Sequence, residues 1–164
     1  EISCSLVGSE MCIRDRLEDR LPIEAITVMV QKEAAQRICA EVGTRQSGAV
    51  TVSVNYYAEP EMLFGVSAGS FMPAPKVDSA VIRLNVRKEP PVKVESEKLL
   101  FNVIKAAFSQ RRKTLANSLS SGLSVEKGKI NELLINSGVE TNARAEKLTL
   151  DDFANITNNL QEMM

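Results

Sequence analysis

The sequence predicts an α/β fold in its first half and an all-helical domain after it. Residues 23–30 (IEAITVMV) are apolar and partly β-branched, which is typical of a strand buried in a parallel sheet. A helical pattern follows directly, and a strand followed by a helix is half of a βαβ unit. Beyond Pro90 and Pro91 the pattern changes from strand-like to helical. We therefore predict a domain boundary near residues 88–95.

A rigid loop and a strand follow one another in residues 71–84, FMPAPKVDSAVIRL. Pro73 and Pro75 fix their own φ angles and push the preceding residues into extended conformations. After Asp78, apolar and polar residues alternate, which predicts a strand with one face better buried than the other. The pattern allows two interpretations. The loop is either a stiff connection between two strands or a holder for a flat substrate group, with Lys76 beside a charged backbone.

Helices are expected on both sides of this strand. Residues 32–42 have apolar positions at helical spacing, and Gly43 follows as a helix stop. Residues 96–110 (SEKLLFNVIKAAFSQ) repeat apolar side chains on one helical face. Residues 125–138 (VEKGKINELLINSG) predict a helix that ends at Gly138. Thr149 and Asp152 have the spacing of a capping box that opens the last helix.

Positive charge is concentrated in the helical half of the chain. Between residues 98 and 125 there are five basic residues and no acidic one: Lys98, Lys105, Arg111, Arg112 and Lys113. With neutral donors such as Gln110 and Asn117 nearby, the cluster suits phosphate oxygens, and RNA binding through it would depend strongly on salt. The alternative is a solvated helix end whose cations complement the helix dipole. The acidic segment after residue 140 is expected to face away from RNA.

Bulk properties limit the remaining functions. The formal net charge of −1 gives no sign of a nucleic-acid partner for the molecule as a whole. Cys4, Cys12 and Cys39 follow no metal-ligand or redox spacing and fit a reducing cytosol. Histidine is absent, which removes the commonest general base and metal ligand. No apolar run is long enough to cross a bilayer, so we expect a cytoplasmic protein with no metal and no membrane partner.

The first residues do not look like the start of a domain. Residues 1–16 (EISCSLVGSEMCIRDR) lack a sufficient apolar run for a signal peptide, because acidic residues interrupt it. We predict that they are a spurious or disordered leader. The predicted organisation is then this leader, a first domain of residues 17–90 and a helical domain of residues 91–164.

Five segments resemble the ribosomal RNA adenine dimethyltransferases, and within that family the bacterial small-subunit branch. They occur in the family's order along most of the chain: MVQKEAAQRI (29–38), SVNYYAE (53–59), FMPAPKVDSAV (71–81), AFSQRRKTLANSL (107–119) and RAEKLTLDDFANITNNL (144–160). The resemblance implies the carboxyl-terminal half of a Rossmann-like S-adenosylmethionine methyltransferase sheet, followed by a small all-α domain. It also bears on residues 50–66, where alternating valines suggest a strand but the family has a short helix through Tyr56 and Tyr57 and then a strand. We follow the family and expect both tyrosines to pack among apolar neighbours.

The resemblance implies dimethylation, at N6, of two adjacent adenosines near the 3′ end of small-subunit (16S) rRNA, with the immature small ribosomal subunit as partner and a monomeric enzyme. It assigns substrate binding to Phe71, Pro73, Pro75 and Lys76, with Phe71 stacking against the extruded adenine. It assigns rRNA binding to Lys105, Gln110, Arg111, Arg112, Lys113 and Asn117. Where the family often has a further arginine, this chain has Ala116. Arg144 and Glu146 match the family's RAE and are expected to form an ion pair.

The family's cofactor and catalytic motifs do not occur in this sequence. It has no glycine-rich G-x-G-x-x-G loop and no Asn-Leu-Pro-Tyr tetrapeptide, and in the family these precede the position of Ile23. We therefore expect no catalytic residue in this chain, S-adenosylmethionine bound by an upstream half, and an inactive and poorly soluble fragment. The alternative is a non-catalytic rRNA-binding or ribosome-assembly module. A macrolide-resistance methyltransferase acting on the large subunit is disfavoured by the FSQRRKTLANSL segment.

Overall fold

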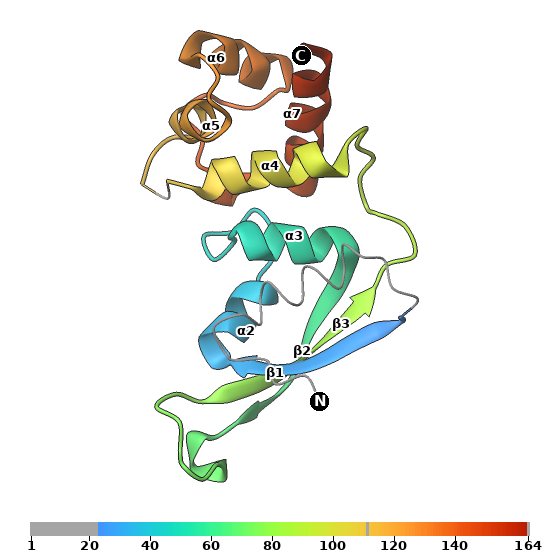
Figure 1. Cartoon of the computed structure of the whole chain (residues 1–164), viewed down its shortest axis with the longest axis vertical. Helices are drawn as coiled ribbons and strands as arrows, with labels where there is room; N and C mark the ends of the chain where they lie inside the picture. The colour runs from blue at the N-terminus through green and yellow to red at the C-terminus, as the bar shows by residue number, and fades with distance from the viewer. Residues whose placement is uncertain (1–22, 111, 164) are drawn as a thin grey trace. The chain divides into compact units, whose positions relative to one another are not determined.

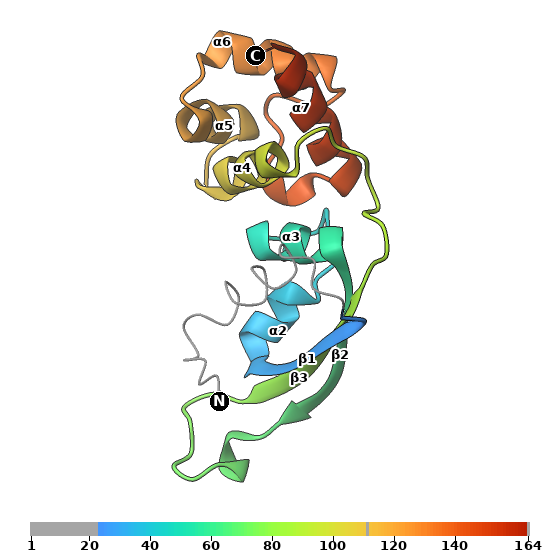
Figure 2. The same cartoon turned by 45° about the vertical axis from the view of Figure 1, so that its right-hand side comes forward.

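The computed structural model describes residues 23–110 and 112–163, and these form three strands, six α-helices and two short 3-10 helices (Figure 1). The predicted leader lies outside the described residues. The chain divides into two compact units (Figure 2). The first contains the described part of Glu1–Ala40 together with Val54–Pro90, and the second contains Glu41–Ser53 and the described part of Pro91–Met164. Glu41–Ser53 therefore groups with the helical unit, although the sequence prediction placed it in the first domain.

The first unit is built on a three-stranded sheet. Strands β1 (Ala25–Gln31), β2 (Ala58–Val66) and β3 (Ser79–Val86) lie in the order β1-β3-β2, and β3 is antiparallel to both neighbours. The parallel sheet expected around residues 23–30 is therefore wrong for these pairs. β1 and β2 do run in the same direction, as a βαβ unit requires. They are not neighbours, because the loop of residues 67–78 reverses the chain and β3 inserts between them.

The two faces of the sheet differ in burial. Ile82 and Leu84 are fully buried on the face where helix α2 (Lys32–Ile38) packs, as the alternation in the sequence predicts (Figure 1). On the other face the register aligns Met29, Val81 and Phe64 across the three strands. Met29 is 48% exposed and Phe64 is 58% exposed. Between Met62 and Phe64 the register shifts, and neighbouring Leu63 is also exposed.

The helices that join β1 to β2 differ in part from expectation. α2 ends at Ile38 rather than Val42, and Gly43 lies in the following turn with a φ of 87°. Helix α3 (Ala49–Tyr57) runs directly into β2, which confirms the helix expected from the family. Tyr56 and Tyr57 are buried, with an edge-to-face ring contact at 5.0 Å between centroids. α3 is buried on nearly all sides, including Val52 and Val54 and the polar Thr51 and Ser53 between and beside them. The alternation of valine with small polar residues therefore does not mark one buried and one exposed face, as it would in a half-buried strand.

The second unit contains helices α4 (Glu97–Phe108), α5 (Leu115–Leu123), α6 (Lys127–Asn136) and α7 (Leu150–Met163), with a 3-10 turn at Ala145–Lys147. The apolar positions predicted from helical spacing supply its core, including Leu100, Ile104, Leu133 and Phe153. Phe108 stacks on Phe153 at 6.1 Å between ring centroids. α5 approaches α4 so closely at Gly122 that an added Cβ would lie 2.5 Å from the Cβ of Ala106. A glycine is needed at this crossing because any side chain would collide with α4.

The ends of α6 and α7 confirm their sequence signals. At the end of α6, the Gly138 N–H donates to the carbonyl of Ile135 and the Val139 N–H to that of Leu134, which is the Schellman pattern. At the start of α7, the Thr149 N–H donates to Asp152 Oδ2 at 2.8 Å and the Asp152 N–H donates to Thr149 Oγ1 at 3.2 Å. The expected ion pair between Arg144 and Glu146 is not present among the ion pairs of the described residues.

Candidate functional site

The loop that carries the predicted substrate-binding residues is fixed at its base. Asp78 Oδ1 accepts a hydrogen bond from the Ala68 N–H at 3.0 Å. The backbone carbonyl of Asp78 accepts another from the Lys32 N–H, also at 3.0 Å. Ser67 Oγ accepts from the Gly69 N–H in the short 3-10 helix Ala68–Ser70. Residues 67 and 78 are therefore held where β2 ends and β3 begins. The loop between them projects from this rigid base.

The tip of the loop is open to solvent. Phe71 is half-buried, whereas Pro73, Pro75 and Lys76 are exposed and Met72 is fully exposed. Of the four predicted substrate-binding residues, Lys76 alone is among the described residues that line the groove next to the loop. Phe71, Pro73 and Pro75 are thus available to a partner from outside the groove.

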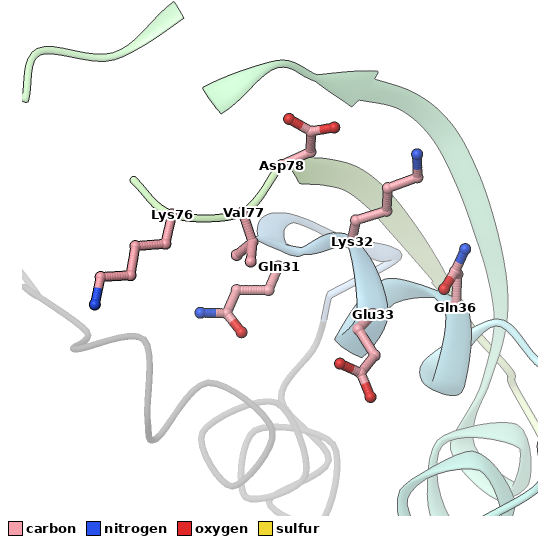
Figure 3. A pocket seen from close by; sticks show the side chains of 7 residues that line it. All are labelled: Gln31, Lys32, Glu33, Gln36, Lys76, Val77 and Asp78. Carbon is pink, nitrogen blue, oxygen red and sulfur yellow. The ribbon is translucent and has the colours of Figure 1, made fainter. Parts of the chain in front are cut away.

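This groove has a volume of about 530 Å³ and lies between the end of β1, the start of α2 and the end of the loop (Figure 3). Its described lining consists of Gln31, Lys32, Glu33, Gln36, Lys76, Val77 and Asp78. The contributions of β1 and α2 were not predicted from the sequence. The sequence does contain one signal for them, the run of polar residues that follows the apolar strand β1. In the structure Gln31 pairs with Ser79, and this pairing places the polar run beside the loop.

The lining of the groove contains two acids and two bases, and they differ in whether they have a partner within the protein. The Glu33 carboxylate is engaged by Arg37, whose guanidinium donates to it at 2.7 Å. The Asp78 carboxylate is engaged by the Ala68 N–H. Lys32 and Lys76 are exposed, and neither forms an ion pair within residues 23–110 and 112–163. The groove therefore offers two ammonium groups to an external anion.

The predicted RNA-binding residues lie around the connection between α4 and α5. Lys105 is exposed in the last turn of α4, and Arg112 and Lys113 are exposed in the connection itself. Arg111 lies outside the described residues. Two backbone hydrogen bonds form next to these cations: the Lys113 N–H donates to the carbonyl of Gln110, and the Leu115 N–H donates to that of Ala143. The structure thus brings Lys105, Arg112 and Lys113 into one segment at the end of α4.

The neutral residues of the same cluster are partly used by the fold. Gln110 is half-buried, and its Nε2 donates to Ser121 Oγ at 3.2 Å. Asn117 is half-buried in α5. Ala116 is only 2% exposed, so the position where the family often has arginine belongs to the core in this chain. The cations rather than the amides are therefore the free binding groups of this segment.

The junction between β1 and α2 contains no glycine, because β1 ends at Gln31 and α2 begins at Lys32. Within the part of the chain that the structure describes, no three Cys, Asp or Glu side chains gather as metal ligands. Burial raises the pKa of the Cys39 thiol, which disfavours a thiolate at this position. No described helix is both long and apolar enough to span a membrane.

Comparisons with known proteins identify the family of this chain. The family model described as ribosomal RNA adenine dimethylase matches residues 4–162, and the chain therefore belongs to this family. The match begins inside residues 1–16, so it includes most of the stretch that we predicted to be a leader. Ribosomal RNA small subunit methyltransferase A of Alkaliphilus oremlandii is 43% identical over 149 residues, which are 90% of this chain and 52% of that protein. The chain spans about half the length of the curated relatives it matches.

Solved structures show the same fold. A dimethyladenosine transferase from Plasmodium falciparum has a TM-score of 0.76 and 22% sequence identity, with 94% of this chain and 63% of that chain covered. The 23S rRNA methyltransferase ErmE has a TM-score of 0.64 and 23% identity, with 96% of this chain and 63% of that chain covered. The described elements therefore form an α/β methyltransferase-like fold with a small antiparallel sheet and helices.

Proposed function

We propose that this chain is the RNA-engaging, carboxyl-terminal part of an enzyme that dimethylates N6 of two adjacent adenosines near the 3′ end of small-subunit rRNA. In this proposal S-adenosylmethionine, the methyl donor, is bound by an upstream half that completes a Rossmann-like sheet. The helical unit docks on the rRNA of the immature small subunit, and the enzyme acts as a cytoplasmic monomer. The small-subunit name of the 43% identical relative favours this substrate over large-subunit rRNA.

The observation that carries the proposal is the basic connection between α4 and α5. Arg112 and Lys113 are exposed there, in a stretch of the sequence without acidic residues. The Lys113 N–H donates to the carbonyl of Gln110, and the Leu115 N–H donates to that of Ala143. Phosphates that bind a cluster of exposed cations release counterions, which favours binding. Phe71 at the loop tip, half-buried and close to open solvent, is proposed to stack on the target adenine.

The proposal is tested by replacing Arg111, Arg112 and Lys113 together with glutamine. We expect weaker binding of small-subunit rRNA and a shallower dependence of the logarithm of the binding constant on the logarithm of salt concentration. The slope should fall by about 0.7 for each lost contact if the bound RNA is single-stranded. Fluorescence anisotropy across a salt series measures both quantities.

The matched control removes three cations from the same unit but outside the connection. Lys93, Lys127 and Lys129 are exposed, and their replacement with glutamine changes the net charge by the same amount. We expect the control variant to keep a slope close to that of the parent chain. Equal losses in the two triple variants would reduce the effect to net charge alone and would overturn the assignment of the connection.

A second function is considered because the sequence contains no glycine-rich cofactor motif. A non-catalytic rRNA-binding or assembly module would need no cofactor site. Transfer of labelled methyl groups to immature small-subunit particles separates the two functions when the assay is done with a protein that contains this chain and the upstream half found in its relatives. We expect two methyl groups on each of two adjacent adenosines. RNA binding without any transfer would establish the non-catalytic function.

A further inference from the structure

We infer that the groove beside the loop is a second RNA-backbone site, in which Lys32 and Lys76 contact successive phosphates of a single strand next to the target nucleotide. This inference rests on the proposed function, because it assumes an RNA substrate. It adds a site in the sheet unit to the cationic connection of the helical unit. It also assigns a binding role to Lys32, which the sequence motifs did not indicate.

The charge of the groove carries the first step. Of its two carboxylates, Glu33 is paired with the Arg37 guanidinium, whereas Asp78 accepts a hydrogen bond from the neutral Ala68 N–H and keeps its negative charge. The ammonium groups of Lys32 and Lys76 have no such partner in the described residues and are exposed. The carboxamides of Gln31 and Gln36 add uncharged donors and acceptors to the lining. The groove is thus complementary to an anion that also accepts hydrogen bonds.

The directions of the Lys32 and Lys76 side chains indicate whether the groove binds a small anion or a polymer. In Figure 3 the Lys76 and Lys32 side chains lie on either side of Val77 and point away from each other. Two ammonium groups that diverge cannot both hold one phosphate ion. A polynucleotide carries a charge at each nucleotide, so one strand that passes over Val77 can contact both lysines. Val77 is 49% exposed and offers an apolar surface to a sugar or base between them.

The two walls of the groove are held together before any ligand binds. The hydrogen bond from the Lys32 N–H to the Asp78 carbonyl joins the start of α2 to the end of the loop. The pairing of Gln31 with Ser79 continues this connection into the sheet. Because Lys76 lies in the same loop as Phe71, a strand in the groove would lead toward the proposed adenine contact. A groove that is already formed keeps the entropic cost of binding low.

The experiment uses the full chain with Lys32→Gln and Lys76→Gln combined. Both changes keep the backbone N–H of residue 32, so the bond to Asp78 is retained, and circular dichroism checks that the variant is folded. Anisotropy with a labelled single-stranded RNA that contains two adjacent adenosines measures affinity across a salt series. We expect the salt slope to fall by about 1.4, which corresponds to two lost phosphate contacts. The control pair Lys88→Gln and Lys129→Gln removes two exposed lysines outside the groove, and we expect it to keep the parent slope.

The other outcomes of this experiment distinguish failure of the groove site from failure of the proposed function. An unchanged slope in the Lys32 and Lys76 variant, with RNA still bound, would overturn the groove site and leave the proposed function intact. Absence of RNA binding by the parent chain would overturn both proposals. Inorganic phosphate is compared with chloride at equal ionic strength as a competitor. We expect no difference between them, and displacement of RNA by phosphate alone would show a single-anion site instead of a backbone site.

Discussion

At the scale of single residues, Gly138 has a conformational role that can be measured. Its φ of 73° lies in the left-handed region, where a Cβ is unfavourable, and no atom lies within 4 Å of the position a Cβ would take. Gly138→Ala should therefore act through backbone strain alone. We expect the free energy of unfolding to fall by about 1 kcal/mol, measured by urea denaturation.

Gly128 provides the control in the same helix. It lies in the first turn of α6 without a positive φ, and an added Cβ would meet only Glu126 Oε1, at 3.7 Å. Gly128→Ala should raise the free energy of unfolding by about 0.5 to 1 kcal/mol, because alanine loses less backbone entropy in a helix. A loss of stability in both variants would contradict the assignment of Gly138 as a conformational stop.

Sequence reasoning at this scale succeeded where the signal is local. Gly138 was predicted to end α6 because a glycine after an apolar periodic segment is a frequent helix stop. The same rule misplaced the end of α2. Gly43 is also left-handed, but it lies beyond the helix end, where its Cα faces the backbone carbonyls of Lys147 and Leu148. That close approach joins residues far apart in the sequence, so no local pattern indicates it.

At the scale of secondary-structure elements, the capping box fixes where α7 begins. Asp152 Oδ2 accepts from both the N–H and the hydroxyl of Thr149, each at 2.8 Å. Asp152→Ala removes both bonds and leaves the Thr149 N–H without this acceptor. We expect the free energy of unfolding to fall by about 1 kcal/mol, with a thermal or urea unfolding curve as the measurement.

Asp151→Ala is the matched change. Asp151 is exposed in the same first turn and carries the same charge toward the helix amino terminus. Its removal should cost only a few tenths of a kcal/mol, which is about the contribution of the helix dipole at an exposed site. Equal effects of the two substitutions would mean that charge, rather than the hydrogen bonds of Asp152, stabilises the start of α7.

The elements also show why some predictions from pattern were wrong. The apolar run of β1 is typical of a parallel strand, yet its described neighbour β3 is antiparallel. Direction depends on which strand lies next to β1, and the residues of β1 do not encode it. α3 shows the converse case. Its alternating valines suggested a strand, but the helix expected from the family is present, and burial on nearly all sides includes the polar Thr51 and Ser53 as well as the valines.

At the scale of the whole molecule, one sheet face leaves apolar side chains in solvent. Met29 and Phe64 flank Val81 on this face, and the outer edges of β1 and β2 are unpaired within the described residues. Exposed apolar faces and open edges favour association. We expect Met29→Thr combined with Phe64→Thr to raise the solubility of the chain and to lower its binding of a hydrophobic dye. Threonine is β-branched and favours strands, so the sheet should be retained.

Ile135→Thr is the control for this prediction. Ile135 is 68% exposed in α6, away from the sheet, and its replacement also removes exposed apolar surface. We expect little change in solubility or dye binding from this variant, because single exposed apolar residues are normal on protein surfaces. A larger effect from Ile135 than from the Met29 and Phe64 pair would contradict the role of the sheet face.

The sequence alone was enough to predict the family, the helices α4, α6 and α7, the end signals of α6 and α7, and the loop that carries Lys76, but it did not predict α5. These features depend on periodicity and on contacts between residues a few positions apart, so they can be read from one stretch at a time. Only the folded chain shows that β3 lies between β1 and β2, that Lys32 faces the same groove as Lys76, and that Gln110 donates to Ser121. The groove and its two lysines without ion-pair partners among the described residues arise from strand pairing between distant segments and from the choice of partner for each polar side chain. Both are fixed only when the chain has folded.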